Sequence, residues 1–244
     1  MTSSEVWDEA TAASYDDDVA AEFAPDVVGP AVEFLHSLAA GGPILEFAIG
    51  TGRVGLPLTE RGMAVTGVEL SEPMVDRLRR KVDEHTLPVV LGDMATTRVP
   101  GEFSLVVLVF NSISNLLTQE EQIECFRNAA RHLRSGGRFV VELWVPPVHS
   151  LPPGRTEVAR EVRDGFAAFD TYDVASQACT SQTFSRRPDG SVRHDIGHFR
   201  YLWASECDLM ARLAGLVLET RVADWHGRPF DFTSSKHISV WRKP

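Results

Sequence analysis

The chain has 244 residues, which is enough for one domain with an added lobe and too few for a two-domain dehydrogenase of ordinary size. Hydrophobic residues make up 43% and charged residues 24%, which is typical of a globular protein rather than of a disordered or fibrous one. Lys and Arg number 24 against 34 Asp and Glu, so the formal net charge is −10. We therefore expect no nucleic-acid partner and no attraction to an anionic membrane, because both need a basic surface.

The three cysteines, Cys125, Cys179 and Cys207, are far apart and form no CxxC pair, which disfavours a zinc knuckle or a redox pair and is typical of a reducing compartment. The first ten residues are polar and acidic, unlike a signal peptide. No apolar run approaches the roughly 18 residues of a membrane-spanning helix. We expect a soluble, cytoplasmic protein, and the sequence indicates no oligomeric state.

Taken in chain order, the predicted elements begin with helices and then alternate. Residues 3–23 have the composition of an acidic helix or pair of turns, and residues 26–40 carry apolar side chains at helical spacing. Short apolar strands and amphipathic helices follow, which indicates a parallel sheet covered on both faces. The expected strands are 44–49, 64–70, 88–91, 103–110 and 138–145, and the expected helices between them are 53–61, 72–84 and 118–134.

The alternation breaks after residue 145. Residues 166–203 have strand patterns without helices, with a turn signal at 187–190, and we interpret 146–203 as an antiparallel insertion or lid. A helix at 205–214 and strands at 216–222 and 237–242 complete the chain. The predicted fold is α/β, with a doubly wound, mostly parallel seven-stranded sheet and the antiparallel insertion after its fifth strand. We expect one domain over 1–244, made of segments 1–41, 42–145, 146–203 and 204–244.

Gly50, Gly52 and Gly55 form a G-x-G-x-x-G turn between the first strand and its helix. Glu69 lies nineteen residues after Gly50, at the end of the second strand. This arrangement is typical of Rossmann-like nucleotide sites, in which the glycines permit close approach and the acid accepts hydrogen bonds from ribose hydroxyls. A plain strand-to-helix turn is the alternative, and the glycines alone do not choose the ligand.

Glu46 bears on the choice of ligand because a carboxylate inside an apolar strand must be paired or hydrogen-bonded. Near a nucleoside-binding loop its natural partner is a cation. NAD presents pyrophosphate there, which an acid would repel, whereas S-adenosylmethionine presents an ammonium and a sulfonium. At this point the sequence resembles the small-molecule type of class I S-adenosylmethionine-dependent methyltransferase: residues 45–52 (LEFAIGTG) are similar to the family's first motif, with Ala48 at the usual first glycine.

The resemblance continues in order over about residues 15–145. Residues 67–74 (GVELSEPM) resemble the second motif and 91–94 (LGDM) the third, and Tyr15-Asp16 resembles a pair that folds over the cofactor. It implies Glu69 on the ribose, Asp93 on the adenine amino group, and an N-terminal helical lid over residues 1–41. The cofactor-binding residues that the resemblance implies are Tyr15, Glu46, Ala48, Gly50, Gly52, Arg53, Glu69, Leu70, Met74, Asp93, Met94, Phe110 and Asn111. The cofactor is S-adenosyl-L-methionine and the product S-adenosyl-L-homocysteine.

The family reaction displaces the sulfonium in line with a nucleophile on the acceptor, which we expect to be a small organic molecule. An amine acceptor needs little help, whereas a hydroxyl or carbon acid needs a general base. His194 and His198 are candidate bases on one face of a strand, and Tyr201 is a candidate on the other. We expect no metal, because the acidic run at 16–18 is typical of a solvated helix face.

Whether nitrogen, oxygen or carbon is methylated stays open at this stage. Two other functions also stay open: an NAD-dependent oxidoreductase that uses the same glycine turn, and a nucleoside-binding module without catalysis. The acceptor is expected at the carboxyl ends of the first, fourth and fifth strands, because open parallel sheets bind ligands there. Phe110, Asn111 and Trp144 are placed on that rim, and residues 191–203 are expected to form its roof.

Overall fold

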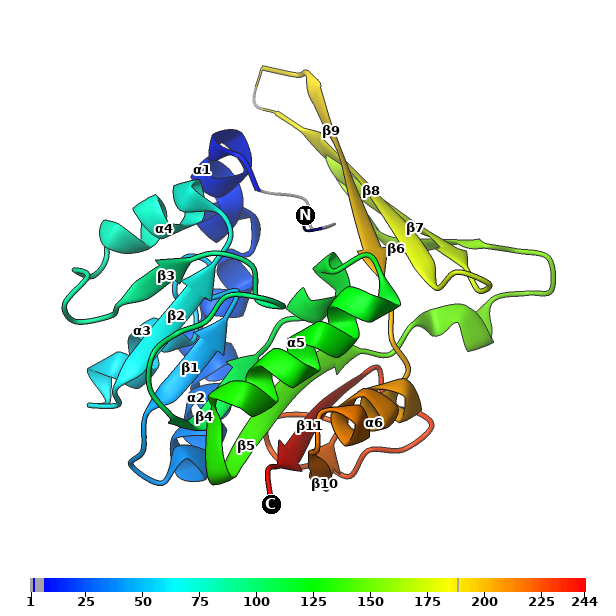
Figure 1. The fold of residues 1–244 in the computed structure, drawn as a ribbon. Coiled ribbons are helices and arrows are strands. Elements are labelled where there is room, and N and C mark those ends of the chain that lie inside the picture. The colour runs from blue at the N-terminus through cyan, green and yellow to red at the C-terminus, as the bar shows by residue number, and fades with distance from the viewer. Residues whose placement is uncertain (1, 3–6, 188) are drawn as a thin grey trace.

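The computed structural model describes residue 2, residues 7–187 and residues 189–244. Residues 1 and 3–6 of the expected N-terminal segment, and residue 188 of the expected turn, lie outside the described residues. The main sheet has seven strands in the order β3-β2-β1-β4-β5-β11-β10 (Figure 1). Its strands are β1 (Ile44–Phe47), β2 (Val65–Glu69), β3 (Val89–Leu91), β4 (Phe103–Leu108), β5 (Leu133–Trp144), β10 (Val217–Val222) and β11 (Lys236–Arg242).

The first five strands pair in parallel, and β11 runs antiparallel to both of its neighbours, β5 and β10. This arrangement confirms the predicted mostly parallel, seven-stranded sheet. β1 and β4 are buried along their whole lengths, as expected for central strands covered on both faces. The strand order reverses between β1 and β4, where ligands of open α/β sheets bind.

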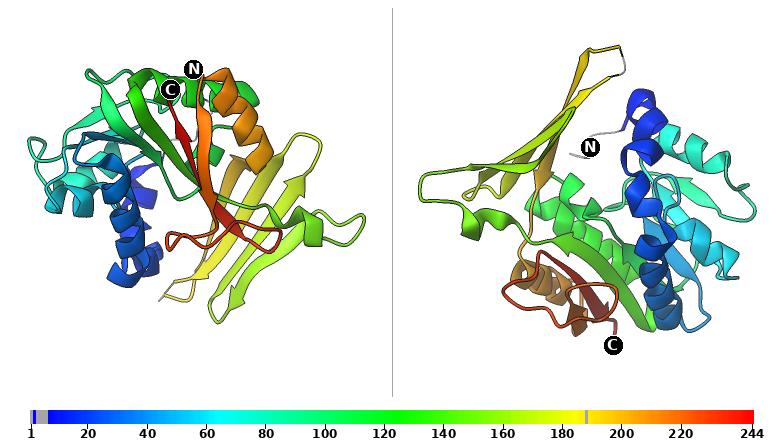
Figure 2. Two further views of the ribbon diagram at one scale, coloured as in Figure 1. Left: turned by 90° about the horizontal axis from the view of Figure 1, so that it is seen from below. Right: turned by 180° about the vertical axis from the view of Figure 1, so that it is seen from behind.

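Helices cover both faces of this sheet and make two separate hydrophobic cores (Figures 1 and 2). Apolar side chains of α5 and α6 pack on one face, and those of α2, α3 and α4 pack on the other. The helices are α1 (Glu9–Asp18), α2 (Pro25–Ala39), α3 (Gly55–Glu60), α4 (Glu72–Arg79), α5 (Gln119–His132) and α6 (Ala204–Leu213), with short helical turns η1 (Ala20–Phe23), η2 (Ser112–Asn115) and η3 (Pro147–Ser150).

A second, antiparallel sheet lies between β5 and α6 in the chain and stands beside the carboxyl ends of the parallel strands (Figure 1). Its order is β6-β7-β8-β9, and it confirms the predicted antiparallel insertion. Its strands are β6 (Glu157–Arg163), β7 (Phe166–Asp173), β8 (Ala178–Arg186) and β9 (Val192–Arg200). The strand β6 was not predicted: its sequence, EVAREVR, is mostly exposed at the edge of the sheet and therefore lacks an apolar pattern.

Other differences concern element ends. The helix predicted over 72–84 ends at Arg79, and β5 begins at Leu133 rather than at residue 138.

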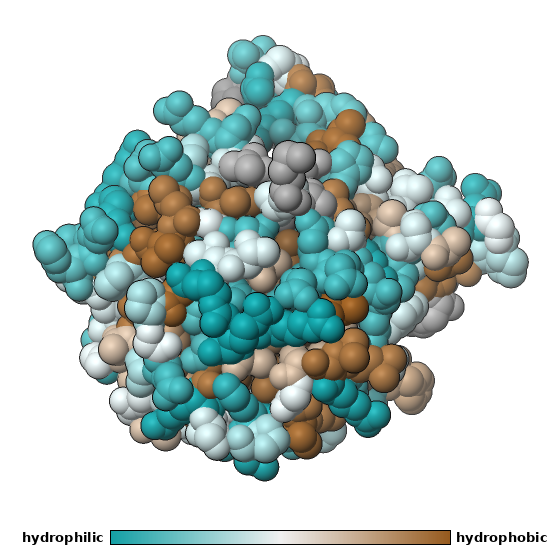
Figure 3. All heavy atoms as spheres, viewed as in Figure 1, coloured by the Kyte–Doolittle hydropathy of each residue, from teal (hydrophilic) through white to brown (hydrophobic). Residues whose placement is uncertain are grey.

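Hydrophilic residues cover most of the face shown in Figure 3, and hydrophobic ones lie in separate groups. Within the described part of the chain, no helix is both long and apolar enough to span a bilayer.

Candidate cofactor and acceptor site

The loop after β1 makes a tight turn that brings backbone N–H groups to the edge of the sheet. Gly50 and Gly52 have positive φ angles of 56° and 88°, a conformation that glycine adopts without strain. Ala48 also has a positive φ, 51°, at the position where the family usually has glycine. A Cβ atom on Gly55 would lie 2.6 Å from Glu46 Oε2, so the third glycine allows α3 to approach the first strand.

Glu69 ends β2 and is tied to this turn. Its Oε2 accepts a hydrogen bond from the Gly50 N–H at 2.8 Å, and its Oε1 accepts one from the Ser71 N–H at 2.9 Å. Burial raises the pKa of the Glu69 carboxyl, and the hydrogen bonds from Ser71 and Gly50 oppose that rise. Each carboxylate oxygen retains a lone pair for a further donor, because ionised carboxylates offer about four acceptor positions.

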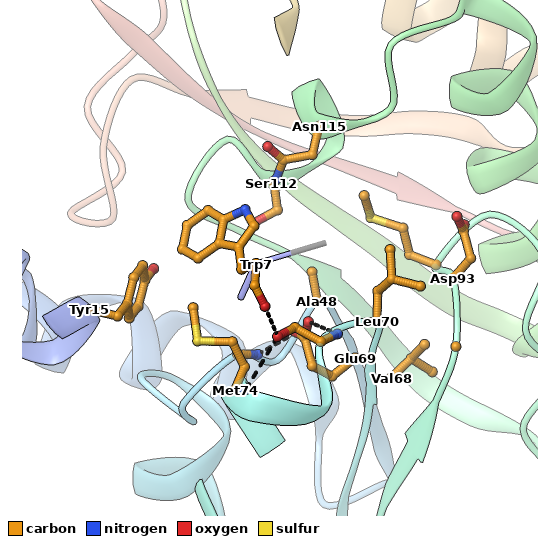
Figure 4. A pocket seen from close by; sticks show the side chains of 14 residues that line it. Trp7, Tyr15, Ala48, Val68, Glu69, Leu70, Met74, Asp93, Ser112 and Asn115 are labelled. Atoms are coloured by element: carbon orange, nitrogen blue, oxygen red, sulfur yellow. Dashed lines mark hydrogen bonds between the residues drawn. The ribbon is translucent and has the colours of Figure 1, made fainter. Parts of the chain in front are cut away.

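A cavity opens above Glu69 at the carboxyl ends of β1, β2 and β3 (Figure 4). Eight of the residues named from the sequence line it together: Tyr15, Ala48, Gly50, Glu69, Leu70, Met74, Asp93 and Met94. Six residues that were not predicted individually also line it: Val68, Ser71 and Gly92 within the quoted motifs, and Trp7, Ser112 and Asn115. The sequence motifs therefore converge on one site, although they come from separate segments of the chain.

Five other residues named from the sequence do not line this cavity: Glu46, Gly52, Arg53, Phe110 and Asn111. Glu46 lies buried beneath the glycine turn, and its Oε2 accepts no hydrogen bond from the described residues. Burial raises the pKa of Glu46 to about 8, while the positive charge of Arg53 opposes the rise. Arg53 is thus a protein cation whose charge acts on Glu46, and its guanidinium lies 4.5 Å from the centre of the Phe110 ring.

The N-terminal segment covers the cavity. The Trp7 indole projects into it (Figure 4), and the Trp7 ring lies 5.0 Å from the Tyr15 ring in an edge-on arrangement. Ser71 Oγ donates to the Trp7 carbonyl at 2.6 Å. With Trp7 in this position the cavity measures about 80 Å³, well below the roughly 300–1,000 Å³ of ordinary small-molecule sites.

Within the acidic run at residues 16–18, Asp16 contacts other side chains, whereas Asp17 and Asp18 are exposed. Asp16 accepts a hydrogen bond from Thr51 Oγ1 and forms an ion pair with Lys81, both at 2.5 Å. These contacts tether α1 to the glycine turn. Among the described residues, no group of three or more His, Cys, Asp or Glu side chains is placed to hold a metal ion.

The turn after β4 holds two non-glycine residues in the left-handed conformation, Phe110 at φ 58° and Asn111 at φ 60°. Such conformations cost free energy and persist where surrounding contacts fix them. Glu142 on β5 supplies those contacts: its Oε2 accepts from the Phe110 N–H at 3.0 Å, and its carbonyl accepts from the Asn111 N–H at 3.1 Å. Trp225 Nε1 and Lys236 Nζ each donate to Glu142 Oε1 at 3.0 Å.

A second, larger cavity of about 610 Å³ lies between the end of β5 and the inserted sheet. Asn111 and Trp144 of the predicted rim and Tyr201 of the predicted roof line it, whereas Phe110, also predicted on the rim, does not. Asn111 and Ser114 face this cavity, whereas Ser112 and Asn115 face the smaller one. The segment from Asn111 to the end of η2 therefore separates the two cavities.

The two candidate histidines lie away from both cavities. His194 and His198 are exposed on β9, on the face opposite to Phe199, which lines the larger cavity. His194 Nε2 lies 3.1 Å from Gln182 Oε1, and His198 Nδ1 lies 3.3 Å from Thr180 Oγ1. The structure thus brings Tyr201 to the acceptor side and leaves His194 and His198 outside it. The four-residue spacing correctly put the histidines on one face but carried no information on which face is inward.

Comparison with known proteins agrees with this geometry. A family model described as a methyltransferase domain matches residues 44–137. The chain is 37% identical to the CcbJ methyltransferase of Streptomyces caelestis, whose structure superposes with a TM-score of 0.83 over 97% of this chain and 99% of that one. The chain therefore belongs to the class I S-adenosylmethionine-dependent methyltransferases and is an enzyme. S-adenosylmethionine is its cofactor, and the NAD-dependent and non-catalytic alternatives are set aside.

Two further relatives match to different extents. The chain is 28% identical to the cypemycin N-terminal methyltransferase of a Streptomyces species, over 98% of both chains. It is 38% identical to a dTDP-3-amino-3,4,6-trideoxy-alpha-D-glucopyranose N,N-dimethyltransferase of Streptomyces venezuelae, over 41% of this chain and 42% of that one. The first similarity spans the inserted sheet, whereas the second covers less than half of the chain.

Proposed function

We propose that this enzyme transfers a methyl group to an amine nitrogen of a small organic molecule. The observation that carries the proposal is the lining of the larger cavity, which among the described residues contains no histidine and a single carboxylate, Asp170, that is paired with Arg160. Burial raises the pKa values of its two tyrosines, Tyr172 and Tyr201, which lowers still further the fraction of each that is deprotonated and able to act as a base at neutral pH. A neutral amine brings its own lone pair and needs no base. Two of the relatives are also named for amine methylation.

The smaller cavity fits the cofactor by the chemistry of its donors and acceptors. Its S-adenosylmethionine, when bound, supplies an electrophilic methyl group on a sulfonium. Glu69 would accept hydrogen bonds from the ribose hydroxyls, and Asp93 would accept one from the adenine amino group. Met74 and Met94 offer polarisable apolar contacts for the adenine ring, and Tyr15 would cover the methionine end. Glu46, Arg53 and Gly52 would act from beneath by fixing the glycine turn.

Phe110 and Asn111 would set the distance between methyl donor and acceptor. They occupy the strained turn that divides the two cavities, and Glu142 holds that turn from below. Bringing reacting atoms into near-attack geometry is the main contribution an enzyme can make to a displacement of this kind. Aromatic rings on the acceptor side, including Trp144 and Tyr201, suit the positive charge that spreads from sulfur during the transfer.

We further propose that the two sheets act as one catalytic domain, with residues 146–203 as the lid over the acceptor. A small acceptor rather than a nucleic acid is supported by the net charge of −10. The three cysteines are unpaired and buried, which favours the reducing environment of the cytoplasm.

The test is a transfer assay with S-adenosylmethionine carrying a deuterated methyl group and matched pairs of small amines and alcohols. We expect the label on nitrogen, with kcat/KM following the deprotonated fraction of each amine. We also expect His194→Ala, His198→Ala and Tyr201→Phe to retain activity. Label on oxygen or carbon would contradict the proposal, as would a loss of about 10²- to 10⁴-fold in one of the three variants, which is the size expected for a lost general base.

A further inference from the structure

The larger cavity contains a single carboxylate among its described lining residues, Asp170 on β7. The other walls are mainly apolar and aromatic, with Trp144, Val158, Phe199 and Tyr201 among them. A volume of about 610 Å³ is in the range that holds a small organic ligand, and such sites orient their ligands with a few polar groups. The position of Asp170 is therefore a candidate determinant of which acceptor fits.

Asp170 faces inward because alternate residues of β7 point to the same side. Ala168, Asp170 and Tyr172 are all buried, whereas Phe169 between them is exposed. Across the sheet, Asp170 is paired with Val158 on β6 and with Ser181 on β8. The inner face of the inserted sheet therefore presents a carboxylate to the cavity, at a buried position where an apolar residue is more common.

The two oxygens of this carboxylate differ in their surroundings. Oδ2 lies 3.5 Å from Arg160 Nε and 3.4 Å from the Tyr172 hydroxyl, which donates to it. Oδ1 is buried and accepts no hydrogen bond from the described part of the chain. The Asp170 side chain is 9% exposed, so bulk water does not satisfy this oxygen. A buried acceptor without a donor is destabilising, and a ligand that offers a donor removes that cost.

Charges around the cavity decide what kind of donor suits Asp170. Arg160 already compensates Asp170, and the other lining cation, Lys236, is paired with Glu142 at 3.0 Å. No uncompensated negative charge is left among the described lining residues, so a neutral donor fits better than a cation. The methylated nitrogen itself is also a poor occupant here, because a carboxylate favours the protonated amine, which has no lone pair to attack with.

We propose that Asp170 Oδ1 accepts a hydrogen bond from a neutral hydroxyl group of the acceptor, remote from the nitrogen that is methylated. This inference rests on the proposed amine acceptor and adds the second group by which the acceptor is recognised. The nitrogen lies at the Asn111 end of the cavity, beside the cofactor site, and the hydroxyl at the inserted sheet. Asp170 thus selects hydroxylated amines over amines that lack the hydroxyl group.

The test uses two probes that differ by one hydroxyl group, trans-4-aminocyclohexanol and cyclohexylamine. Their affinities for the enzyme loaded with S-adenosyl-L-homocysteine are measured by calorimetry, together with KM and kcat for methyl transfer. We expect about tenfold tighter binding and lower KM for the hydroxylated probe, since one buried hydrogen bond is worth about a factor of ten. Asp170→Ala should remove the difference, and Asp170→Asn should keep most of it, because the amide oxygen still accepts from a neutral hydroxyl.

Three controls separate this inference from the proposed function. Asp164→Ala changes an exposed carboxylate in the turn between β6 and β7 of the inserted sheet and should leave the preference intact. Affinity for S-adenosyl-L-homocysteine should be unchanged in all variants, which shows that they are folded. Equal binding of the two probes, or no binding of either, would overturn the role of Asp170. Equal weakening in Asp170→Asn and Asp170→Ala would also overturn it, by showing that the charge is required. Label transfer to the hydroxyl oxygen of trans-4-aminocyclohexanol would contradict the amine proposal and with it the remote position of the hydroxyl, whereas loss of the preference with the label still on nitrogen would contradict only the role of Asp170.

Discussion

Replacing Glu69 by Ala should weaken cofactor binding, and the number of hydrogen bonds that Glu69 can still accept limits the size of the effect. Each carboxylate oxygen of Glu69 already accepts one backbone N–H, from Gly50 at 2.8 Å and from Ser71 at 2.9 Å. Two acceptor positions are then left for two ribose hydroxyls. The loss of these charge-assisted hydrogen bonds should cost about 1–3 kcal/mol, which corresponds to an increase in Kd of about 5- to 150-fold.

The assay is calorimetric titration of S-adenosyl-L-homocysteine into the wild type, Glu69→Ala and the control Glu72→Ala. Glu72 is exposed in the first turn of α4, three residues from Glu69, and its replacement should leave Kd unchanged. Thermal unfolding of each variant corrects for any loosening of the turn. An unchanged Kd in Glu69→Ala would refute the placement of the ribose, and an equal loss in both variants would show a non-specific effect.

Three further predictions concern other parts of the site. Cofactor binding should displace the Trp7 indole from the cavity. Titration with S-adenosyl-L-homocysteine should therefore change tryptophan emission in the wild type and in Trp203→Phe but not in Trp7→Phe. A change that survives in Trp7→Phe would contradict the displacement. Burial raises the pKa of Glu46 to about 8 from an ordinary 4.5, so its protonation stabilises the fold at low pH, and this contribution is lost as pH rises through 8. In denaturant titrations, the unfolding free energy of the wild type should therefore fall between about pH 5 and 8 relative to that of Glu46→Gln. Parallel pH profiles of the two unfolding free energies would contradict the raised pKa of Glu46. Glu142→Gln should lower kcat by roughly 10- to 100-fold while leaving cofactor Kd nearly unchanged, because it loosens the turn between the cavities; a change in Kd alone would contradict that role.

The cofactor half of the site was largely predictable because its residues follow strand ends. The carboxyl ends of parallel strands share one edge, so Ala48, Glu69 and Asp93 had to converge once the strands were recognised. Phe110 and Asn111 were predicted both at the cofactor and on the acceptor rim; in the structure their strained backbone places Asn111 in the lining of the acceptor cavity, and Phe110 lines neither cavity. Local pattern carries no signal for such a backbone, since it depends on the contacts that Glu142 makes across β4 and β5.

The acceptor half was less predictable because its residues lie on an inserted sheet whose packing is tertiary. Trp7 precedes every motif, and its only signal was an isolated aromatic residue in a polar segment. Asp170 did leave a signal: in the alternating pattern of β7 it shares a face with Ala168 and Tyr172, as a lone carboxylate on an apolar side. The spacing could not predict which way His194 faces, because alternation along a strand separates two faces without showing which of them points to the cavity.

The most direct test of the account is a crystal structure of the protein with S-adenosyl-L-homocysteine. We predict that the ligand lies in the cavity at the carboxyl ends of β1, β2 and β3, with the ribose hydroxyls within hydrogen-bonding distance of Glu69 and the sulfur directed toward the turn at Phe110 and Asn111. The Trp7 indole should have left its present position. Ligand bound elsewhere, or bound in this cavity with its ribose away from Glu69, would contradict the account.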